Sequence, residues 1–184
     1  MTSASTSGGT VVLGAGSPLL GDDGLGVQVI ATLVDRWAES PTLSFLDGGI
    51  WGMRLLPHIE DARQLLVVDA IRAGARPGTL IRLERDEIPK HLRGKLSTHQ
   101  IDLGEVFAVA ELRGHFPAEA VALGIEPESF DAFDELSGTV RARVPALLAA
   151  IERQLTAWGH VLEPRGPGLG PIGRAPPAGA THHA

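Results

Sequence analysis

The stretch Thr10-Val-Val-Leu-Gly-Ala-Gly-Ser-Pro-Leu-Leu-Gly-Asp-Asp-Gly-Leu-Gly26 decides the fold of this chain. It starts with Val11 to Leu13, a short continuous apolar run typical of a strand covered on both faces. Gly14 and Gly16 follow, and they predict a sharp turn because glycine adopts positive φ without steric cost. From Val27 onward, apolar residues recur at helical spacing. The stretch therefore predicts a buried strand, a glycine-rich turn and a helix in succession.

Carboxylates follow this strand and two later ones. Asp22 and Asp23 lie in the glycine-rich turn, while Asp47 and Asp69 each come directly after a further apolar run. Parallel strands joined by right-handed crossovers end at one edge of the sheet, which is where open α/β sheets bind ligands. A later helical pattern places His99 on its first turn. We therefore expect these carboxylates and one imidazole to gather at a single edge.

The remaining chain alternates between strand and helix patterns. Further strands are expected at 41–46, 64–68, 79–83 and 120–125, and further helices at 50–60, 97–112 and 137–155. This alternation predicts an α/β fold, a three-layer α/β/α sandwich around a mainly parallel, about five-stranded sheet. We expect residues 1–9 to be a flexible N-terminus, 10–162 the folded domain, and the Pro/Gly-rich stretch 163–184 to be disordered.

The composition is that of an ordinary globular domain. The chain has 184 residues, of which 43% are hydrophobic and 21% charged. Its net charge of −6 argues against nucleic-acid or anionic-membrane partners, which need a basic surface. The absence of cysteine excludes disulfides, thiolate metal sites and a cysteine nucleophile. The sequence has neither a long apolar segment nor a signal-peptide pattern, so we expect a cytoplasmic protein.

The residues themselves leave several functions open. Gly14-Ala-Gly16 begins like a dinucleotide-binding motif, but Leu19 occupies the third glycine position and the acids of the turn would repel a pyrophosphate. Mixed carboxylate and imidazole groups suit zinc, nickel, iron or manganese. On spacing alone, however, Asp23 and Asp69 could equally cap a helix or a turn, and His99 could be an ordinary surface residue. No motif of a serine hydrolase or an H-E-x-x-H protease is present.

Five blocks, taken in order, resemble the nickel–iron hydrogenase maturation endopeptidases. They are Val12–Val27, Leu46-Asp-Gly-Gly49 with Gly52-Met53, Leu66-Val-Val-Asp-Ala70, Lys95-Leu-Ser-Thr-His-Gln100, and Gly124-Ile-Glu-Pro-Glu-Ser129. In that family the turn reads roughly G-x-G-N-x-L-x-x-D-[DE]-G-x-G, and Ser17 stands where the asparagine is usual. The resemblance runs from Val11 to Gly159 and thus covers nearly all of the expected domain.

This resemblance implies an endopeptidase, grouped with the aspartic-type peptidases, that works as a monomer on one partner. It would remove the C-terminal extension of a hydrogenase large-subunit precursor once nickel has been inserted. Asp23, Asp69 and His99 carry over as metal ligands that recognise nickel on the precursor, rather than binding it permanently. Asp47 carries over as an acid near the scissile bond that could activate water.

Whether such hydrolysis would be metal-assisted or driven by a carboxylate stays open at this point. The alternatives are a non-hydrolytic, nickel-dependent checkpoint or chaperone that binds the precursor without cutting it, and a nucleotide-binding α/β protein.

Overall fold

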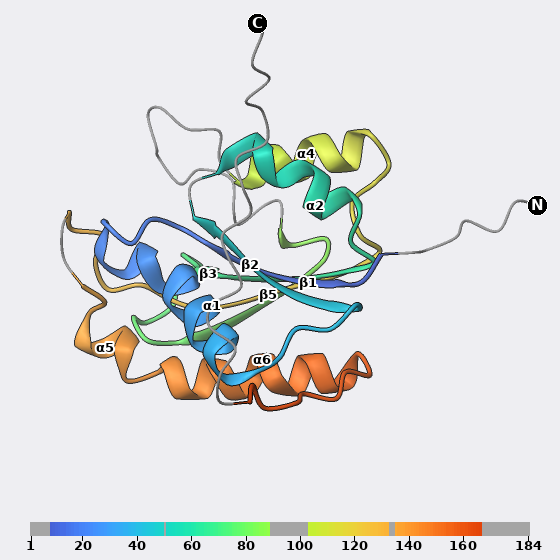
Figure 1. The fold of residues 1–184 in the computed structure, drawn as a ribbon. Helices are drawn as coiled ribbons and strands as arrows, with labels where there is room; N and C mark the ends of the chain where they lie inside the picture. Colours follow the sequence, from blue (N-terminus) through green and yellow to red (C-terminus); the bar gives the residue numbers. More distant parts are fainter. Residues whose placement is uncertain (1–7, 50, 89–102, 133–134, 167–184) are drawn as a thin grey trace, which may run out of the picture.

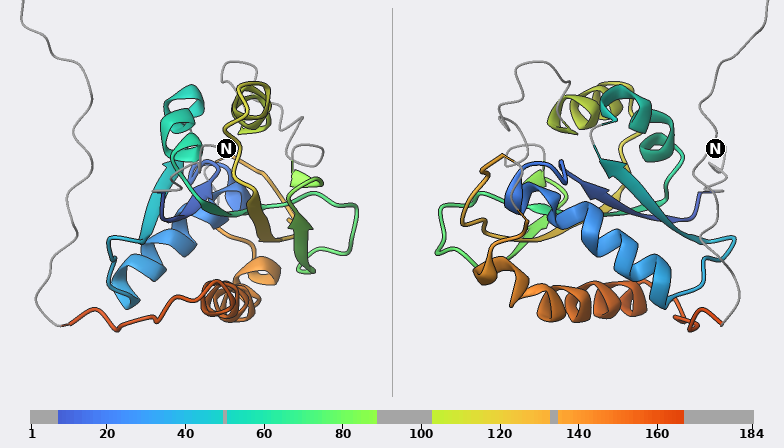
Figure 2. Two further views of the ribbon diagram at one scale, coloured as in Figure 1. Left: turned by 90° about the vertical axis from the view of Figure 1, so that its right-hand side faces the viewer. Right: turned by 60° about the vertical axis from the view of Figure 1, so that its left-hand side comes forward.

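The computed structural model describes residues 8–49, 51–88, 103–132 and 135–166. A five-stranded sheet lies between two layers of helices (Figure 1). Helices α1 and α6 cover one face of the sheet, and α2 and α4 cover the other (Figure 2). The predicted three-layer α/β/α architecture is confirmed.

The sheet is mostly parallel. Its strands are β1 (Thr10–Ala15), β2 (Leu43–Gly49), β3 (Gln64–Ala70), β4 (Leu80–Glu84) and β5 (Glu119–Ile125), in the order β2-β1-β3-β5-β4. Strands β1, β2, β3 and β5 run parallel, and β4 joins the edge antiparallel to β5. The expectation that Asp47 and Asp69 follow their strands is wrong in detail, because β2 and β3 run on and include them.

The helical elements are η1 (Gly21–Gly24), α1 (Leu25–Arg36), η2 (Gly52–Leu55), α2 (Leu56–Glu60), α4 (Leu103–Leu112), α5 (Gly138–Arg141) and α6 (Val144–Ala157). The helix expected over 137–155 is divided into α5 and α6. Ser137 is the N-cap of α5, and its hydroxyl accepts a hydrogen bond from the Val140 amide at 3.2 Å. Pro145 lies in the first turn of α6, where its missing N–H costs no helical hydrogen bond.

Each face of the sheet has its own apolar core. The α1/α6 side is filled by alternate strand residues such as Val12 and Val68, together with Ile30 of α1. The α2/α4 side takes the intervening residues, among them Leu13 and Val67. Strand β3 is buried along its whole length, as its continuous apolar run predicts. Asp69, near the carboxyl end of β3, is therefore held by a strand that is packed on both faces.

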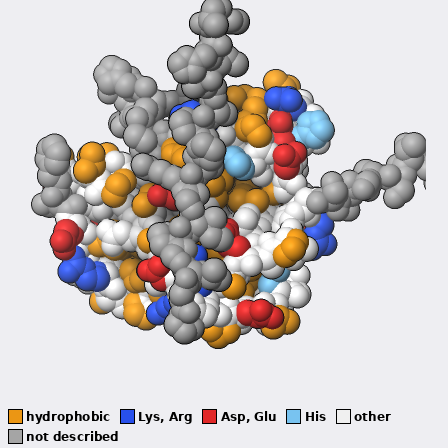
Figure 3. All heavy atoms as spheres, viewed as in Figure 1, with side chains coloured by type: hydrophobic (Ala, Val, Ile, Leu, Met, Phe, Trp, Pro, Cys, Tyr) orange, Lys and Arg blue, Asp and Glu red, His pale blue; other side chains and the backbone are white. Residues whose placement is uncertain are grey.

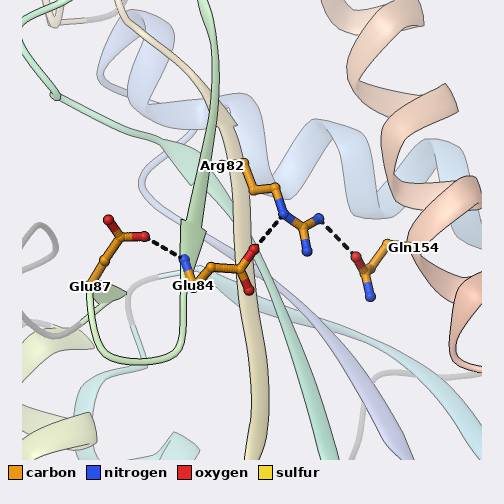
Figure 4. Close-up of polar contacts among 4 residues, drawn as sticks. All are labelled: Arg82, Glu84, Glu87 and Gln154. Atoms are coloured by element: carbon orange, nitrogen blue, oxygen red, sulfur yellow. Dashed lines mark hydrogen bonds and ion pairs between the residues drawn. The ribbon is translucent and has the colours of Figure 1, made fainter.

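A surface network holds the edge strand β4 to α6 (Figure 4). The Arg82 guanidinium donates to Glu84 at 2.7 Å and to Gln154 of α6 at 2.8 Å. The Glu84 amide in turn donates to Glu87 at 2.8 Å. Charged side chains along an edge strand discourage pairing with another chain. On the face seen in Figure 3, acidic, basic and apolar side chains are interspersed wherever the atoms are coloured.

The folded domain extends beyond residue 162, the boundary expected from the sequence. The Ala38 amide donates to the Glu163 carbonyl at 2.9 Å, and the Arg165 amide donates to the Arg36 carbonyl at 2.8 Å. The residues just after 162 thus pair with the end of α1, and placing the start of disorder at 163 is wrong by at least three residues. Residues from 167 onward lie outside the described part. Within that part, no helix is long and apolar enough to cross a membrane.

Candidate functional site

The glycine-rich turn after β1 is closed by its own hydrogen bonds. The Ser17 amide donates to the Asp23 carboxylate at 2.7 Å, and the Ser17 hydroxyl accepts from the Leu19 amide at 3.3 Å. Gly16 has φ +105°, and a Cβ there would lie 1.9 Å from the Asp23 carbonyl oxygen, so only glycine fits. Serine in place of the family's usual asparagine therefore still closes this turn, since the bond to Asp23 comes from its backbone.

The two adjacent acids of the turn point in different directions. They lie in η1, a 3₁₀ helix, in which successive side chains are about 120° apart. Asp22 is fully buried, whereas Asp23 is half-buried and turns back to the Ser17 amide. The pair is thus divided into one inward and one outward carboxylate.

Asp69 is a buried carboxylate near the end of β3, with 1% of its surface exposed. Its Oδ1 accepts a hydrogen bond from the Ala70 amide at 2.8 Å. In the sheet it pairs with Gly124, where a Cβ would meet the side chain of Ile71, part of the α2/α4 core. Asp69 therefore lies on the α2/α4 side. Because η1 contacts β3, Asp23 and Asp69 belong to neighbouring elements of one edge.

Asp47 lies at the same edge but on the other face of the sheet. It is exposed and pairs with Gly14 of β1, where a Cβ would meet Ile30 of α1. Strand partners share a face, so Asp47 is directed to the α1 side. The expected convergence of all the acids is thus partial, because strand β1 separates Asp47 from Asp69.

His99 lies outside the described residues, and so does the first turn of the helical pattern on which the sequence places it. Helix α4, which follows His99 in the chain, packs on the α2/α4 face, the side on which Asp69 lies. Among the residues that the structure does describe, no three His, Asp or Glu side chains are grouped closely enough to hold a metal ion.

Sequence reasoning missed the roles of two buried acids beside the site. Asp22 accepts hydrogen bonds from the segment after β5, and Glu126 accepts from the amides of Ala73 and Ala75 at 2.8 and 3.1 Å. Glu126 directly follows the buried strand β5, and Asp22 lies in the tight turn after β1. That context, in which a charge needs a partner, was the available signal.

Comparisons with known proteins identify the chain's family. The family model "Hydrogenase maturation protease" matches residues 27–154, a range that contains Asp47, Asp69 and His99. A hydrogenase expression/formation protein, HoxM, of Cupriavidus necator is 36% identical over 166 residues, which cover 88% of this chain and 81% of that protein. The hydrogenase 2 maturation protease of Escherichia coli is 33% identical over 156 residues, covering 84% of this chain and 95% of the relative.

Solved structures agree with the family match. The hydrogenase maturating endopeptidase HybD from E. coli superposes with a TM-score of 0.77 at 32% identity, covering 85% of this chain and 98% of HybD. A [NiFe] hydrogenase maturation protease, HycI, from Thermococcus kodakarensis gives a TM-score of 0.63 at 27% identity, covering 80% and 92% of the two chains. The chain therefore belongs to the hydrogenase maturation protease family and is a hydrogenase maturation endopeptidase.

Proposed function

We propose that this enzyme removes the C-terminal extension of a nickel–iron hydrogenase large-subunit precursor after nickel has been inserted. In this proposal Asp23, Asp69 and His99 contact the nickel ion that the precursor carries, so that cleavage depends on the metal. The observation that supports it is the contact of η1 with β3, because these two neighbouring elements carry Asp23 and Asp69.

The proposed ligands Asp23, Asp69 and His99 suit a nickel ion carried by the precursor. Carboxylate oxygens and an imidazole nitrogen are ligands that borderline divalent ions such as nickel accept. Asp69 is buried and braced by the Ala70 amide, while Asp23 is held by the Ser17 amide, so both carboxylates are preorganised. A fixed pair of this kind favours recognition of an ion delivered by another protein, because little conformational freedom is lost on binding.

Asp47 is the proposed general base. It is the exposed acid of the three family carboxylates, so both water and a substrate peptide can reach it. A carboxylate there would take a proton from the attacking water as the oxygen adds to the scissile carbonyl. When the C–N bond breaks, the same proton would pass to the leaving amine.

The test is processing of purified precursor, with and without nickel, followed by mass spectrometry of the large subunit's C-terminus. We expect cleavage of the nickel-loaded form alone, and loss of cleavage in Asp69→Asn, His99→Ala and Asp47→Asn. Asp35→Asn, which alters an exposed acid on α1, is the matched control and should cleave normally.

Equal processing of both precursor forms would refute nickel recognition. A precursor that stays full-length under all conditions would refute the assignment of this substrate. A wild-type rate in Asp47→Asn would remove that carboxylate from the chemistry and leave a metal-assisted route.

A further inference from the structure

The buried carboxylate of Asp22 connects the glycine-rich turn to the segment that follows β5. Its Oδ2 accepts hydrogen bonds from the amides of Glu128 at 2.8 Å and Ser129 at 3.1 Å, and from the Ser137 hydroxyl at 3.0 Å. Its Oδ1 accepts from the Ser137 amide at 2.7 Å. In return, the Asp22 amide donates to the Ser129 carbonyl at 3.1 Å. One side chain thus joins segments more than a hundred residues apart.

The segment that Asp22 binds is itself braced by the loop after β3. Glu126 accepts from the amides of Ala73 and Ala75, and the Arg72 guanidinium lies 4.3 Å from the centre of the Phe130 ring. Ser137, the last of the Asp22 partners, is also the N-cap of α5. Asp22 therefore binds a segment that has its own contacts with the loop after β3 and with α5.

Asp22 also precedes Asp23 directly in the short helix η1. The Asp23 amide donates to the Leu20 carbonyl, and its carboxylate accepts from Ser17, so these contacts stay within the turn itself. The Asp22 carboxylate, with four of the hydrogen bonds, and the Asp22 amide, with one, join this turn to the segment after β5. Any movement of Asp22 must carry Asp23 with it, because one peptide unit joins them.

We propose that Asp22 is a positioning residue for the peptidase: its buried carboxylate holds the turn so that Asp23 faces the Asp69 edge of the sheet. The proposal rests on the proposed function in so far as Asp23 contacts the precursor's nickel. It assigns different tasks to the two adjacent acids. Asp23 contacts the nickel of the precursor, and Asp22 fixes the position of the turn that carries Asp23.

Asp22→Asn is the direct test. The asparagine NH₂ group would face at least one of the four donors that bind the carboxylate, and a donor cannot accept that hydrogen bond. The Ser17 amide is the reporter, since its acceptor is the Asp23 carboxylate. We expect hydrogen exchange at Ser17 to accelerate at least about 10-fold in the variant. Thr10→Val, which removes a buried hydroxyl at the opposite edge of the sheet, should leave Ser17 unchanged even if it lowers stability.

Activity gives a second readout that a merely structural role would not reproduce. At a temperature where the variant is fully folded, Asp22→Asn should lower kcat/KM for nickel-loaded precursor at least about 10-fold. The change should appear as a higher KM, with kcat nearly unchanged. In an Asp23→Asn background the same change should cost less than about 2-fold, because residues that act through one another are non-additive. If Asp22→Asn does not fold, Ser137→Ala removes one donor to Asp22 together with the N-cap of α5, and it should move both readouts in the same direction.

Unchanged Ser17 exchange in a folded Asp22 or Ser137 variant would overturn the positioning role, and so would fully additive losses with Asp23→Asn. If the wild-type protein cleaves neither precursor form, the proposed function fails. The exchange measurement still decides the role of Asp22 in that case.

Discussion

Gly26, in the first turn of α1, packs against two strands more closely than any side chain would allow. A Cβ at this position would lie 2.3 Å from the Ala15 carbonyl oxygen, 2.4 Å from the Val68 carbonyl oxygen and 2.6 Å from the Ala15 nitrogen. All three are backbone atoms of β1 and β3, so no side-chain rotation can relieve the overlap. Gly26→Ala must therefore push the start of α1 away from the sheet.

The expected cost of Gly26→Ala follows from two opposing effects. Overpacking in a tight interior costs typically 1–3 kcal/mol, and contact with three backbone atoms places this site at about 3 kcal/mol. Alanine gains about 1 kcal/mol over glycine in helix propensity. The net loss should be about 2 kcal/mol, or roughly 4–8 °C in Tm for a chain of this size.

Urea unfolding followed by circular dichroism measures this loss directly. Gly138→Ala is the matched control, because Gly138 also begins a helix and a Cβ there meets nothing within 4 Å. The control should be neutral or slightly stabilising. Because α1 directly follows η1, Gly26→Ala should also slow precursor cleavage. A Gly26→Ala protein as stable as the wild type would refute the steric reasoning.

Three further predictions concern titratable groups. Asp69→Asn should keep the fold, because its amide oxygen can still accept from Ala70, but should lower the cleavage rate roughly 100-fold by removing a charged contact near the metal. Cleavage assays and a thermal melt of the same sample check both parts. Glu126→Leu should lower the free energy of unfolding by about 1 kcal/mol, measured in urea. It deprives two amides of their acceptor, but both belong to exposed alanines that water can reach. Burial and, less strongly, the Arg63 guanidinium lower the pKa of His160 below its ordinary 6.5. The unfolded chain therefore binds more protons at low pH, and stability should fall as the pH drops below about 6.5. His160→Gln, which can still donate to Thr10, should show a smaller loss between pH 7.5 and 5.5, and an equal loss in both proteins would contradict this reading.

Local patterns in the sequence predicted much of the fold because they report local physics. The continuous apolar run of 65–68 predicted the central strand correctly, since a strand covered on both faces lacks polar alternation. The start of the last helix near residue 137 was also predicted, because helix capping acts within one helical turn.

Features that depend on contacts between distant segments could not be predicted from the sequence. Asp47 was expected beside the other acids, but its face is set by its pairing with Gly14, a contact between distant segments. The burial of Asp22 beside the half-buried Asp23 likewise depends on distant partners of Asp22, namely Glu128, Ser129 and Ser137. The boundary near 162 was misplaced because the residues after it gain backbone partners from the end of α1.

The pairing of residues 163–165 with the end of α1 has a practical consequence. Helix α1 has 12 residues and is about 18 Å long, and it starts at the acidic edge and ends at the opposite one. Strand β1 also begins at that opposite edge, so Gly8 and Gly166 both lie on the side of the sheet away from Asp23 and Asp69. A tether to a surface or a fused protein, joined at either of these points, starts from the far side of the molecule. The candidate site can then face a partner as large as a hydrogenase subunit.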